Sequence, residues 1–252
     1  MNTFEHNHQK LSYIHHGQGD IVFVWVHGWG VDHQYLVNLS KDLSSLGQHY
    51  LVDLPGFGNS PKPEKDWFIS DYAEFMHHFL NSQENKHIVW IGHSFGCRVG
   101  TKLAAHYPDL VKKMVFIAGS GLPIKRSLFQ RMNIFLRIRL FKFMKLFVRG
   151  EENLNKLRSK FGSSDYRTAG DMRQIFMNTF SEHLSEDAKK ISCPVTLLYG
   201  ELDTETPPSM GEDYHSLIKD SSLEIFDGLD HYTILTKGQH QLAHRIKNFI
   251  KE

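Results

Sequence analysis

The sequence predicts an α/β protein with a mostly parallel central sheet and helices on both faces. Short runs of β-branched and aromatic residues alternate along the chain with longer segments of helical periodicity. One of these runs, 21–26, is apolar along its whole length, and another, 195–200, is apolar except for Thr196. Continuous apolar runs are typical of strands buried on both faces, and strand–helix alternation is typical of a parallel sheet covered on both sides.

The expected elements follow one another in order along the 252 residues. The expected strands lie near 10–14, at 21–26 and 49–53, from residue 87 up to Gly92, and at 111–118, 195–200 and 223–226. The expected helices cover about 33–46 and 69–82, then 98–105 with an end near Pro108, and a last one that begins near 207–208. The alternation stops after Gly121 and resumes at 193–194. We therefore expect a core made of 1–120 and 189–252, with an all-helical cap inserted over 121–188.

The most informative segment is Gly92-x-Ser94-x-Gly96, into which the expected strand that begins at residue 87 leads directly. A turn from strand to helix is so tight there that a side chain at position 92 or 96 would strike neighbouring backbone. Such a turn holds the central serine in a strained, exposed position. Ser94 is therefore the predicted nucleophile, because an exposed hydroxyl can attack a carbonyl carbon once a base removes its proton.

A base and a carboxylate follow in an informative order. Asp203 comes just after the strand at 195–200, and His231 comes after the strand at 223–226. Loops after parallel strands meet at the carboxyl edge of the sheet, where open α/β sheets place their sites. Asp203 is preferred as the acid, with Glu205 as the nearest substitute, whereas Asp230 is expected to shape the histidine loop. Among 17 histidines, only His231 lies in the loop directly after the final strand.

Donors for a developing oxyanion are expected from two backbone N–H groups. The strand at 21–26 leads into His27-Gly28-Trp29-Gly30, and the N–H of Trp29 is one predicted donor. The N–H of Phe95, at the start of the helix after Ser94, is the other, and the positive end of that helix favours an anion. Trp29 and Phe95 are also the expected substrate-binding residues.

At this point the chain resembles the α/β-hydrolase superfamily over essentially its whole length. The resemblance is carried by Gly92–Gly96 and by four further segments. These are His27–Gly30, Asp53-Leu54-Pro55-Gly56-Phe57-Gly58-Asn59-Ser60, Tyr199–Asp203 and Asp230-His231. Ser94, Asp203 and His231 then follow the family's order of nucleophile, acid and histidine. Cys97 departs from the pattern, since many relatives carry a smaller residue there. We expect altered packing behind Ser94 and intact chemistry.

The insertion is strongly basic. From Gly121 to Gly150 it contains eight Lys or Arg residues and no Asp or Glu. At 100° per residue, one face of a helix there carries an apolar stripe made of Phe129, Met132, Leu136, Leu140, Phe143 and Phe147. Arg131, Lys142, Lys145 and Arg149 gather roughly opposite. The preferred interpretation is a lid helix that packs its stripe over the active site. Docking of an acidic carrier protein or a phosphate-bearing substrate, and association with a membrane surface, are the alternatives. The segment 164–180 is expected to contribute little chemistry.

Composition limits the other classes of function. A net charge of +1 gives no overall attraction to nucleic acid, and no run approaches the roughly 18 apolar residues of a membrane span. The two cysteines, Cys97 and Cys193, are expected to be buried thiols. The N-terminal residues lack a secretory pattern, so a cytoplasmic location is expected. No metal-binding pattern such as His-Glu-x-x-His exists, and the glycine segments match no nucleotide motif. We expect neither a metal nor a cofactor.

The predicted activity is hydrolysis of a small carboxylic ester through a Ser-His-Asp triad and an acyl-enzyme. Within the resemblance, two narrower activities stay open. One is a methyl ester esterase acting on pimeloyl-carrier protein, which is suggested by His27–Gly30, Asp53–Ser60 and the basic insertion. The other is carbon–carbon bond hydrolysis of a vinylogous diketone, although such enzymes usually carry more glycines around the oxyanion loop. A hydrolase-fold protein that binds a ligand without turnover is the non-enzymatic alternative.

Overall fold

The computed structural model describes residues 1–83, 87–125, 128–150, 153–154, 157 and 164–252. Its strands are β1 Asn2–His6, β2 Gln9–Gly17, β3 Ile21–Val26, β4 Gln48–Asp53, β5 His87–His93, β6 Lys113–Ile117, β7 Val195–Gly200 and β8 Ser221–Phe226. The helices packed on them are α1 Gln34–Asp42, η1 Ser44–Leu46, α2 Ile69–Asn81, α3 Phe95–His106, α9 Pro208–Leu217, α10 Thr233–Thr236 and α11 Gln239–Lys251.

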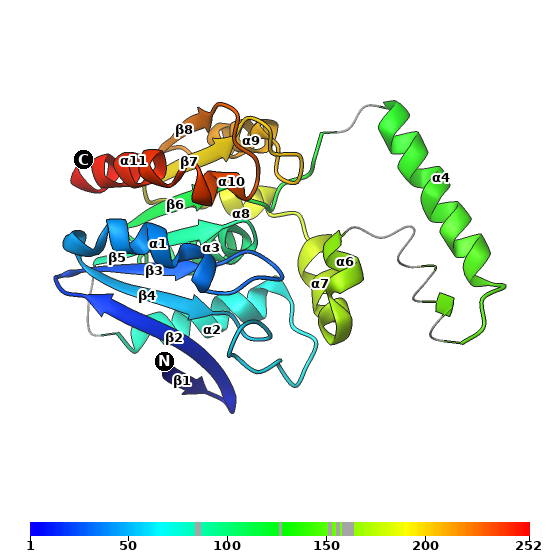
Figure 1. The fold of residues 1–252 in the computed structure, drawn as a ribbon, viewed down its shortest axis with the longest axis horizontal. Coiled ribbons are helices and arrows are strands. Elements are labelled where there is room, and N and C mark those ends of the chain that lie inside the picture. Colours follow the sequence, from blue (N-terminus) through cyan, green and yellow to red (C-terminus); the bar gives the residue numbers. More distant parts are fainter. Residues whose placement is uncertain (84–86, 126–127, 151–152, 155–156, 158–163) are drawn as a thin grey trace.

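The strands form one sheet in the order β1-β2-β4-β3-β5-β6-β7-β8. The pairs β1–β2 and β2–β4 are antiparallel, whereas every pairing from β4 across to β8 is parallel. Figure 1 shows helices on both faces of this sheet. The predicted α/β architecture with a mostly parallel sheet is therefore confirmed.

Alternation along each central strand divides the core into two layers. On β3, Val22, Val24 and Val26 pack into the layer beneath α2, α3 and α9, while Phe23 and Trp25 pack against α1, α10 and α11. Successive strand residues point to opposite faces, so an unbroken apolar strand fills both layers. This packing holds the carboxyl ends of β3, β5, β7 and β8 at one edge of the sheet, where the predicted site residues lie.

The N-terminal edge of the sheet is more extensive than expected. A hairpin joins β1 to β2 through Asn7 and His8, which both have positive φ (49° and 65°). Asparagine tolerates this left-handed region better than most residues. The strand expected near 10–14 extends over Gln9–Gly17, and β1 was not predicted because it is short, polar and mostly exposed.

Between β6 and β7 the described residues are mainly helical. Their helices are α4 Leu128–Lys145, α6 Ser164–Thr168, η2 Gly170–Met172, α7 Arg173–Ser181 and α8 Ser185–Ala188. The prediction of helix over 126–127, 151–152, 155–156 and 158–163 lies outside the described residues, and so does the side chain of Arg131. Figure 1 shows α4 standing away from the sheet, whereas α7 lies between α4 and the core.

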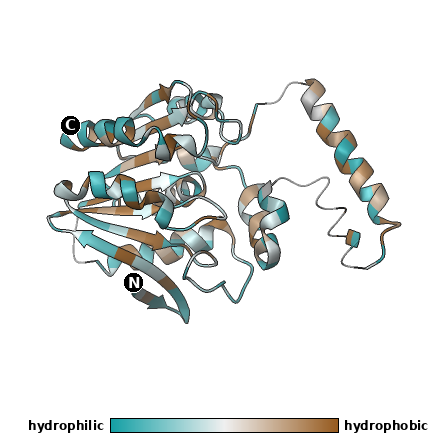
Figure 2. Ribbon diagram, viewed as in Figure 1, coloured by the Kyte–Doolittle hydropathy of each residue, from teal (hydrophilic) through white to brown (hydrophobic). Residues whose placement is uncertain are grey.

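The preferred interpretation of the apolar stripe was wrong in one respect. The stripe does not pack over the active site, because all six of its side chains are at least half exposed. Figure 2 shows hydrophobic and hydrophilic residues alternating along α4, with the helix standing alone. Periodicity reveals that a helix has an apolar face, but it does not identify what covers that face.

Candidate active site

Ser94 lies at the junction of β5 and α3 in a strained backbone conformation. Its φ is 49° and its ψ is −105°. Ser94 is one of four non-glycine residues with positive φ in the described chain. Non-glycine residues held in such sparsely populated regions cost about 1–3 kcal/mol each. The N–H of Ser94 donates to the carbonyl of Ile117 at 3.0 Å, which ties the turn to β6. The predicted tight turn is therefore present.

Two glycines make this turn sterically possible. A Cβ on Gly92 would lie 2.7 Å from the carbonyl carbon of Gly96. A Cβ on Gly96 would lie 2.1 Å from the carbonyl oxygen of Val26, at the end of β3. Both contacts involve backbone, which cannot move aside as a flexible side chain can. Glycine is required at both positions, as the sequence pattern indicates.

Asp203 and His231 meet although 28 residues separate them along the chain. The imidazole Nδ1–H of His231 donates to Oδ2 of Asp203 at 2.7 Å, and both side chains are buried. The other carboxylate oxygen, Oδ1, accepts the backbone N–H groups of Glu205 and Thr206, each at 2.8 Å. These bonds fix the carboxylate and therefore also the tautomer and orientation of the ring. The structure thus pairs His231 with Asp203, the preferred acid.

Sequence reasoning missed two residues that hold this pair. The hydroxyl of Thr206 lies 2.8 Å from Oδ2 of Asp203 and 3.0 Å from the carbonyl of Ala118, so it can donate to either. His93 Nε2–H donates to the backbone carbonyl of His231 at 3.0 Å, which attaches the histidine loop to the residue before Ser94. Burial lowers the pKa of His93 to about 3, so this ring is neutral. Only the Asp-x-x-Thr spacing could have suggested Thr206, as a local cap of the loop.

Ser94 and His231 line the same small hollow, whose volume is about 10 Å³, roughly that of one water. Among the described residues, no hydrogen bond joins the Ser94 hydroxyl to the His231 ring. Nε2 of His231 instead lies 3.6 Å from a carboxylate oxygen of Glu205. Asp165, on α6, lines the hollow as well. The segment 164–180 therefore contributes an acidic side chain to the lining of the hollow, while the expectation that it contributes little chemistry stays a prediction.

Burial changes the acidity of both additional carboxyl groups. Desolvation raises the pKa of Glu205 and of Asp165 above their ordinary values, and the neighbouring His231 partly offsets this rise in each case. Each group therefore stays protonated to a higher pH than a solvated carboxyl. The two side chains belong to different segments, the β7–α9 loop and α6, and they face the same hollow.

The loop that carries Trp29 is held from below and from above. Below it, His27 Nδ1–H donates to the Gly28 carbonyl at 2.7 Å, and its Nε2 accepts the N–H of Leu54 at 3.0 Å. Above it, rings of Phe176 and Phe180 on α7 contact the Trp29 indole edge-on, with centroids 5.1 and 5.6 Å away. Within the described chain, the N–H groups of Trp29 and Phe95 make no hydrogen bond. That these two groups act as oxyanion donors stays a prediction.

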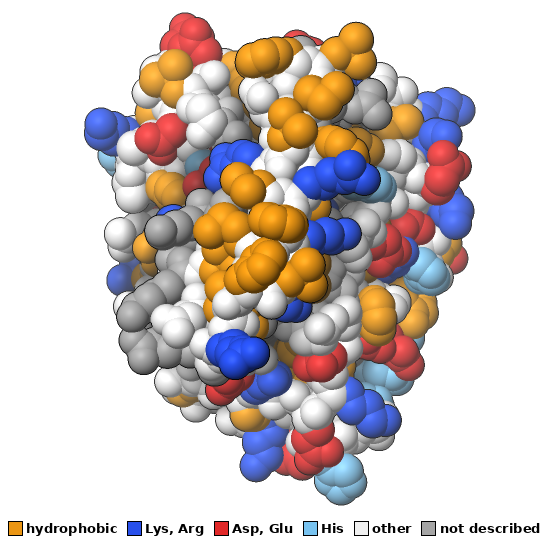
Figure 3. All heavy atoms as spheres, turned by 90° about the vertical axis from the view of Figure 1, so that its right-hand side faces the viewer, with side chains coloured by type: hydrophobic (Ala, Val, Ile, Leu, Met, Phe, Trp, Pro, Cys, Tyr) orange, Lys and Arg blue, Asp and Glu red, His pale blue; other side chains and the backbone are white. Residues whose placement is uncertain are grey.

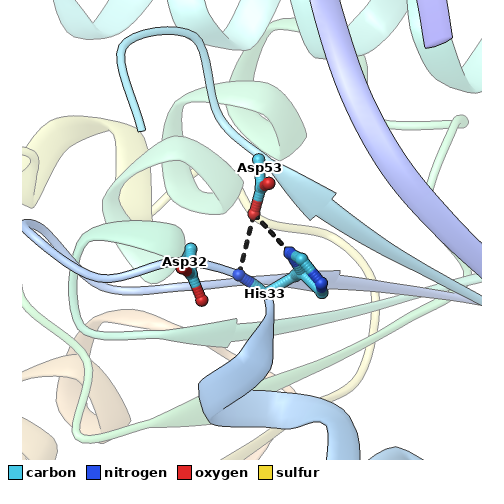
Figure 4. A group of neighbouring side chains, drawn as sticks. All are labelled: Asp32, His33 and Asp53. Atoms are coloured by element: carbon cyan, nitrogen blue, oxygen red, sulfur yellow. Dashed lines mark hydrogen bonds and ion pairs between the residues drawn. The ribbon is translucent and has the colours of Figure 1, made fainter. Parts of the chain in front are cut away.

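A cluster of Asp32, His33 and Asp53 brings together three groups of metal-binding type (Figure 4). Asp53 Oδ1 accepts both the backbone N–H and the Nδ1–H of His33, while Oδ2 accepts two N–H groups of Asn59. Burial opposes ionisation of Asp53, but these bonds outweigh it and hold its pKa below the ordinary value. The cluster therefore joins two loops, and both carboxylate oxygens of Asp53 already accept hydrogen bonds. That the chain works without a metal stays a prediction.

A larger hollow of about 350 Å³ lies between the β1–β2 hairpin and the N-terminal part of α2. Its lining includes His6, Trp67, Glu74 and His78, and none of the residues predicted for the site. Volume alone does not define an active site, because chemistry requires a nucleophile, a base and donors at one place. The small hollow at the sheet edge is the one lined by Trp29, Ser94 and His231, three of the predicted site residues.

These features are typical of α/β proteins that carry a nucleophile on a strand-to-helix elbow at the carboxyl edge of the sheet. The chain belongs to the α/β hydrolase fold family, whose model matches residues 21–160. This membership confirms the resemblance on which the sequence analysis relied. Among the described residues, no helix has the length and apolar character that a bilayer crossing requires.

Individual proteins narrow the comparison. The chain is 24% identical over 88% of its length to a pimeloyl-[acyl-carrier protein] methyl ester esterase of Vibrio cholerae, covering 91% of that protein. An esterase from Exiguobacterium antarcticum superposes with a TM-score of 0.75 at 18% identity, over 97% of this chain and 96% of the other. A meta-cleavage product hydrolase from Pseudomonas fluorescens superposes with a TM-score of 0.73 at 17% identity, over 100% of this chain and 97% of the other. The two structures share the fold, which by itself does not choose between their chemistries.

Proposed function

We propose that this chain is a serine hydrolase that cleaves carboxylic esters with Ser94 as nucleophile, His231 as base and Asp203 as the acid that orients the base. The observation that carries the proposal is the buried 2.7 Å pair between His231 and Asp203, beside a serine in a strained elbow. Esterase relatives such as the one from Vibrio cholerae support an ester as the substrate.

The proposed reaction has two stages. His231 Nε2 takes the proton of the Ser94 hydroxyl as its oxygen attacks the ester carbonyl, and the Asp203 carboxylate stabilises the imidazolium that forms. The N–H groups of Trp29 and Phe95 bind the oxyanion, and a donor of this kind contributes about 3–4 kcal/mol to transition-state stabilisation. His231 then protonates the leaving alcohol. Water, activated by the same ring, hydrolyses the acyl-enzyme.

In this proposal substrate must draw the catalytic groups together. The Ser94–His231 hydrogen bond forms when an ester enters the hollow, since catalytic bonds often tighten only in the substrate complex. Glu205 is then displaced from its place 3.6 Å from His231 Nε2. Trp29 and Phe95 contact the acyl group, because their rings pack edge-to-face 5.2 Å apart beside Ser94.

We further propose that residues 121–188 form a cap over the core of 1–120 and 189–252. The contact of Phe176 and Phe180 with Trp29 supports this, because it places α7 above the oxyanion loop. A cytoplasmic location is also proposed. It is supported by Cys97 and Cys193, which are buried free thiols as a reducing compartment favours.

The test combines turnover with covalent labelling. A series of p-nitrophenyl esters of increasing chain length should be hydrolysed by the wild type and by Ser216→Ala, a control at an exposed serine, but not by Ser94→Ala. A fluorophosphonate should label Ser94 and lose its target on prior heating. A chain that binds esters yet neither turns over nor takes the label would instead be the non-catalytic binding protein.

The methyl ester of pimeloyl-carrier protein is the second candidate substrate. It is favoured by the name of the Vibrio cholerae relative and by the eight cations between residues 121 and 150, which suit an acidic carrier protein. Release of methanol from that substrate would support it. Turnover of small esters without turnover of the carrier-protein ester would exclude it, and cleavage of a vinylogous diketone in preference to esters would support the carbon–carbon alternative.

A further inference from the structure

Helix α4 presents an unusual amount of apolar surface to solvent. More than half of the exposed large hydrophobic side chains in the described part of the molecule lie between residues 128 and 147. Phe129 and Phe147 are 74% and 71% exposed, and Phe143 is 60% exposed. A contiguous exposed apolar surface of this kind marks an interaction site.

The apolar stripe faces away from the rest of the molecule. Only Ile134 and Phe141 among the described side chains of α4 are partly buried, and their spacing of seven residues puts them on one face. At 100° per residue the stripe lies about 150° around the helix from that face. The stripe is therefore directed outward, away from Ser94, which does not suit a lid closing over the site.

Cations border the stripe on both sides. In the helical projection, Arg139 lies at one edge and Arg137 at the other, while Lys142 and Lys145 lie further round. Figure 3, which faces this side of the molecule, shows a band of hydrophobic side chains with Lys and Arg along its margins. No acidic residue occurs between 121 and 150, so nothing on this segment neutralises the positive charge.

We propose that α4 docks in the plane of an anionic lipid bilayer. The stripe enters the boundary between headgroups and acyl chains, and the bordering Arg137 and Arg139 bind lipid phosphates. A second copy of this chain does not fit, because two such helices carry only positive charge and repel each other. An acidic protein would match the cations but requires no apolar stripe along the whole helix. The helix lies in the surface, since no described helix is suited to crossing a bilayer.

Vesicle co-sedimentation tests the proposal directly. The wild type should sediment with phosphatidylcholine vesicles that contain phosphatidylglycerol, and far less with phosphatidylcholine alone. Raising the salt concentration should weaken this binding, because it screens the cations. Phe143→Ser should lower the partition coefficient about tenfold. Its matched control is Phe68→Ser, which removes an equally exposed phenylalanine at 52% exposure from the start of α2 and should leave binding unchanged.

A charge-neutralising pair tests the electrostatic part. Arg137→Gln with Arg139→Gln should reduce binding to anionic vesicles about tenfold, whereas Lys219→Gln with Lys251→Gln, at two exposed lysines outside α4, should not. Hydrolysis of p-nitrophenyl acetate should be unchanged in all four variants, which separates this result from the proposed catalysis. The proposal is overturned by any of three results. These are no binding to anionic vesicles, equal binding of Phe143→Ser, or a role for Phe143 only in dimerisation or carrier-protein capture.

Discussion

Two carboxylates approach opposite nitrogens of the same imidazole, and exchanging each for its amide should separate their roles. Asp203 Oδ2 lies 2.7 Å from Nδ1 of His231, and Glu205 Oε2 lies 3.6 Å from Nε2. In Asp203→Asn the amide cannot provide both the acceptor for Nδ1–H and the charge that stabilises imidazolium. The imidazole of His231 is then free to carry its proton on Nε2 instead of Nδ1. Glu205→Gln, by contrast, leaves in place Asp203 and its four donors, which are two backbone N–H groups, the Thr206 hydroxyl and the His231 ring.

The magnitude follows from the distance. Two unit charges 2.7 Å apart attract by about 6 kcal/mol at an effective dielectric constant near 20. Part of that attraction remains through the amide dipole, so a loss of about 4–5 kcal/mol in the transition state is expected. This loss corresponds to a fall of roughly 10³–10⁴-fold in kcat/KM, similar to that seen for the same change in other triads. Glu205 is half exposed, so its amide variant should keep kcat/KM within about threefold.

Steady-state hydrolysis of p-nitrophenyl acetate by both variants measures these ratios, and circular dichroism shows whether each variant is folded. A larger loss in Glu205→Gln than in Asp203→Asn would refute the assignment, because it would make Glu205 the functional partner of the imidazole. Equal, small losses in two folded proteins would refute the requirement for a carboxylate at position 203.

Three further perturbations test other parts of the account. Gly96→Ala should prevent folding or abolish activity in soluble expression trials, because its Cβ would lie 2.1 Å from a backbone oxygen at the end of β3. Since burial raises the pKa of Asp165 and of Glu205, both gain negative charge as pH rises, so the kcat/KM ratio of an anionic ester to a neutral one should fall with increasing pH. Lys102→Ala breaks a buried pair of ion bridges and should lower the free energy of unfolding by about 3–5 kcal/mol in urea, whereas Lys125→Ala, at an exposed pair, should lower it by at most about 1 kcal/mol.

Each of these has a contradicting outcome. A fully active Gly96→Ala protein would mean that the elbow relaxes more easily than its backbone contacts imply. A substrate ratio that is flat with pH would show that the two acids do not face the bound acyl group. Equal unfolding free energies for the two lysine variants would show that burial adds nothing to the pair that joins α3 to the cap.

The central strands could be predicted from sequence because each carries its own signal. A continuous apolar run defines β3, a nearly continuous one defines β7, and short-range glycine spacing defines the elbow after β5. The hairpin of β1 escaped prediction because its residues are polar and mostly exposed, and its turn depends on two positive-φ residues without glycine. A hydrophobic pattern reveals a strand only where buried positions require apolar side chains.

The three residues of the candidate triad could also be predicted from the sequence. Ser94, Asp203 and His231 each follow a strand, so their convergence at one sheet edge follows from topology alone. His93 was not predictable as a support, because its partner lies 138 residues away and only the fold brings them together, whereas Thr206 lies three residues from Asp203 and could have been suggested as a local cap. Asp165 was not predicted, because sequence periodicity does not show where the inserted helices lie relative to the sheet.

The proposed hydrolysis depends most directly on nucleophilic attack by Ser94. Rapid acid quenching of the enzyme during hydrolysis of a slow p-nitrophenyl ester, followed by peptide mass spectrometry, measures this directly. The account predicts one acyl group per chain on the peptide that contains Ser94, with no acyl group in Ser94→Ala. Acylation of a different residue, or rapid turnover with no acylated peptide under any quench time, would contradict it.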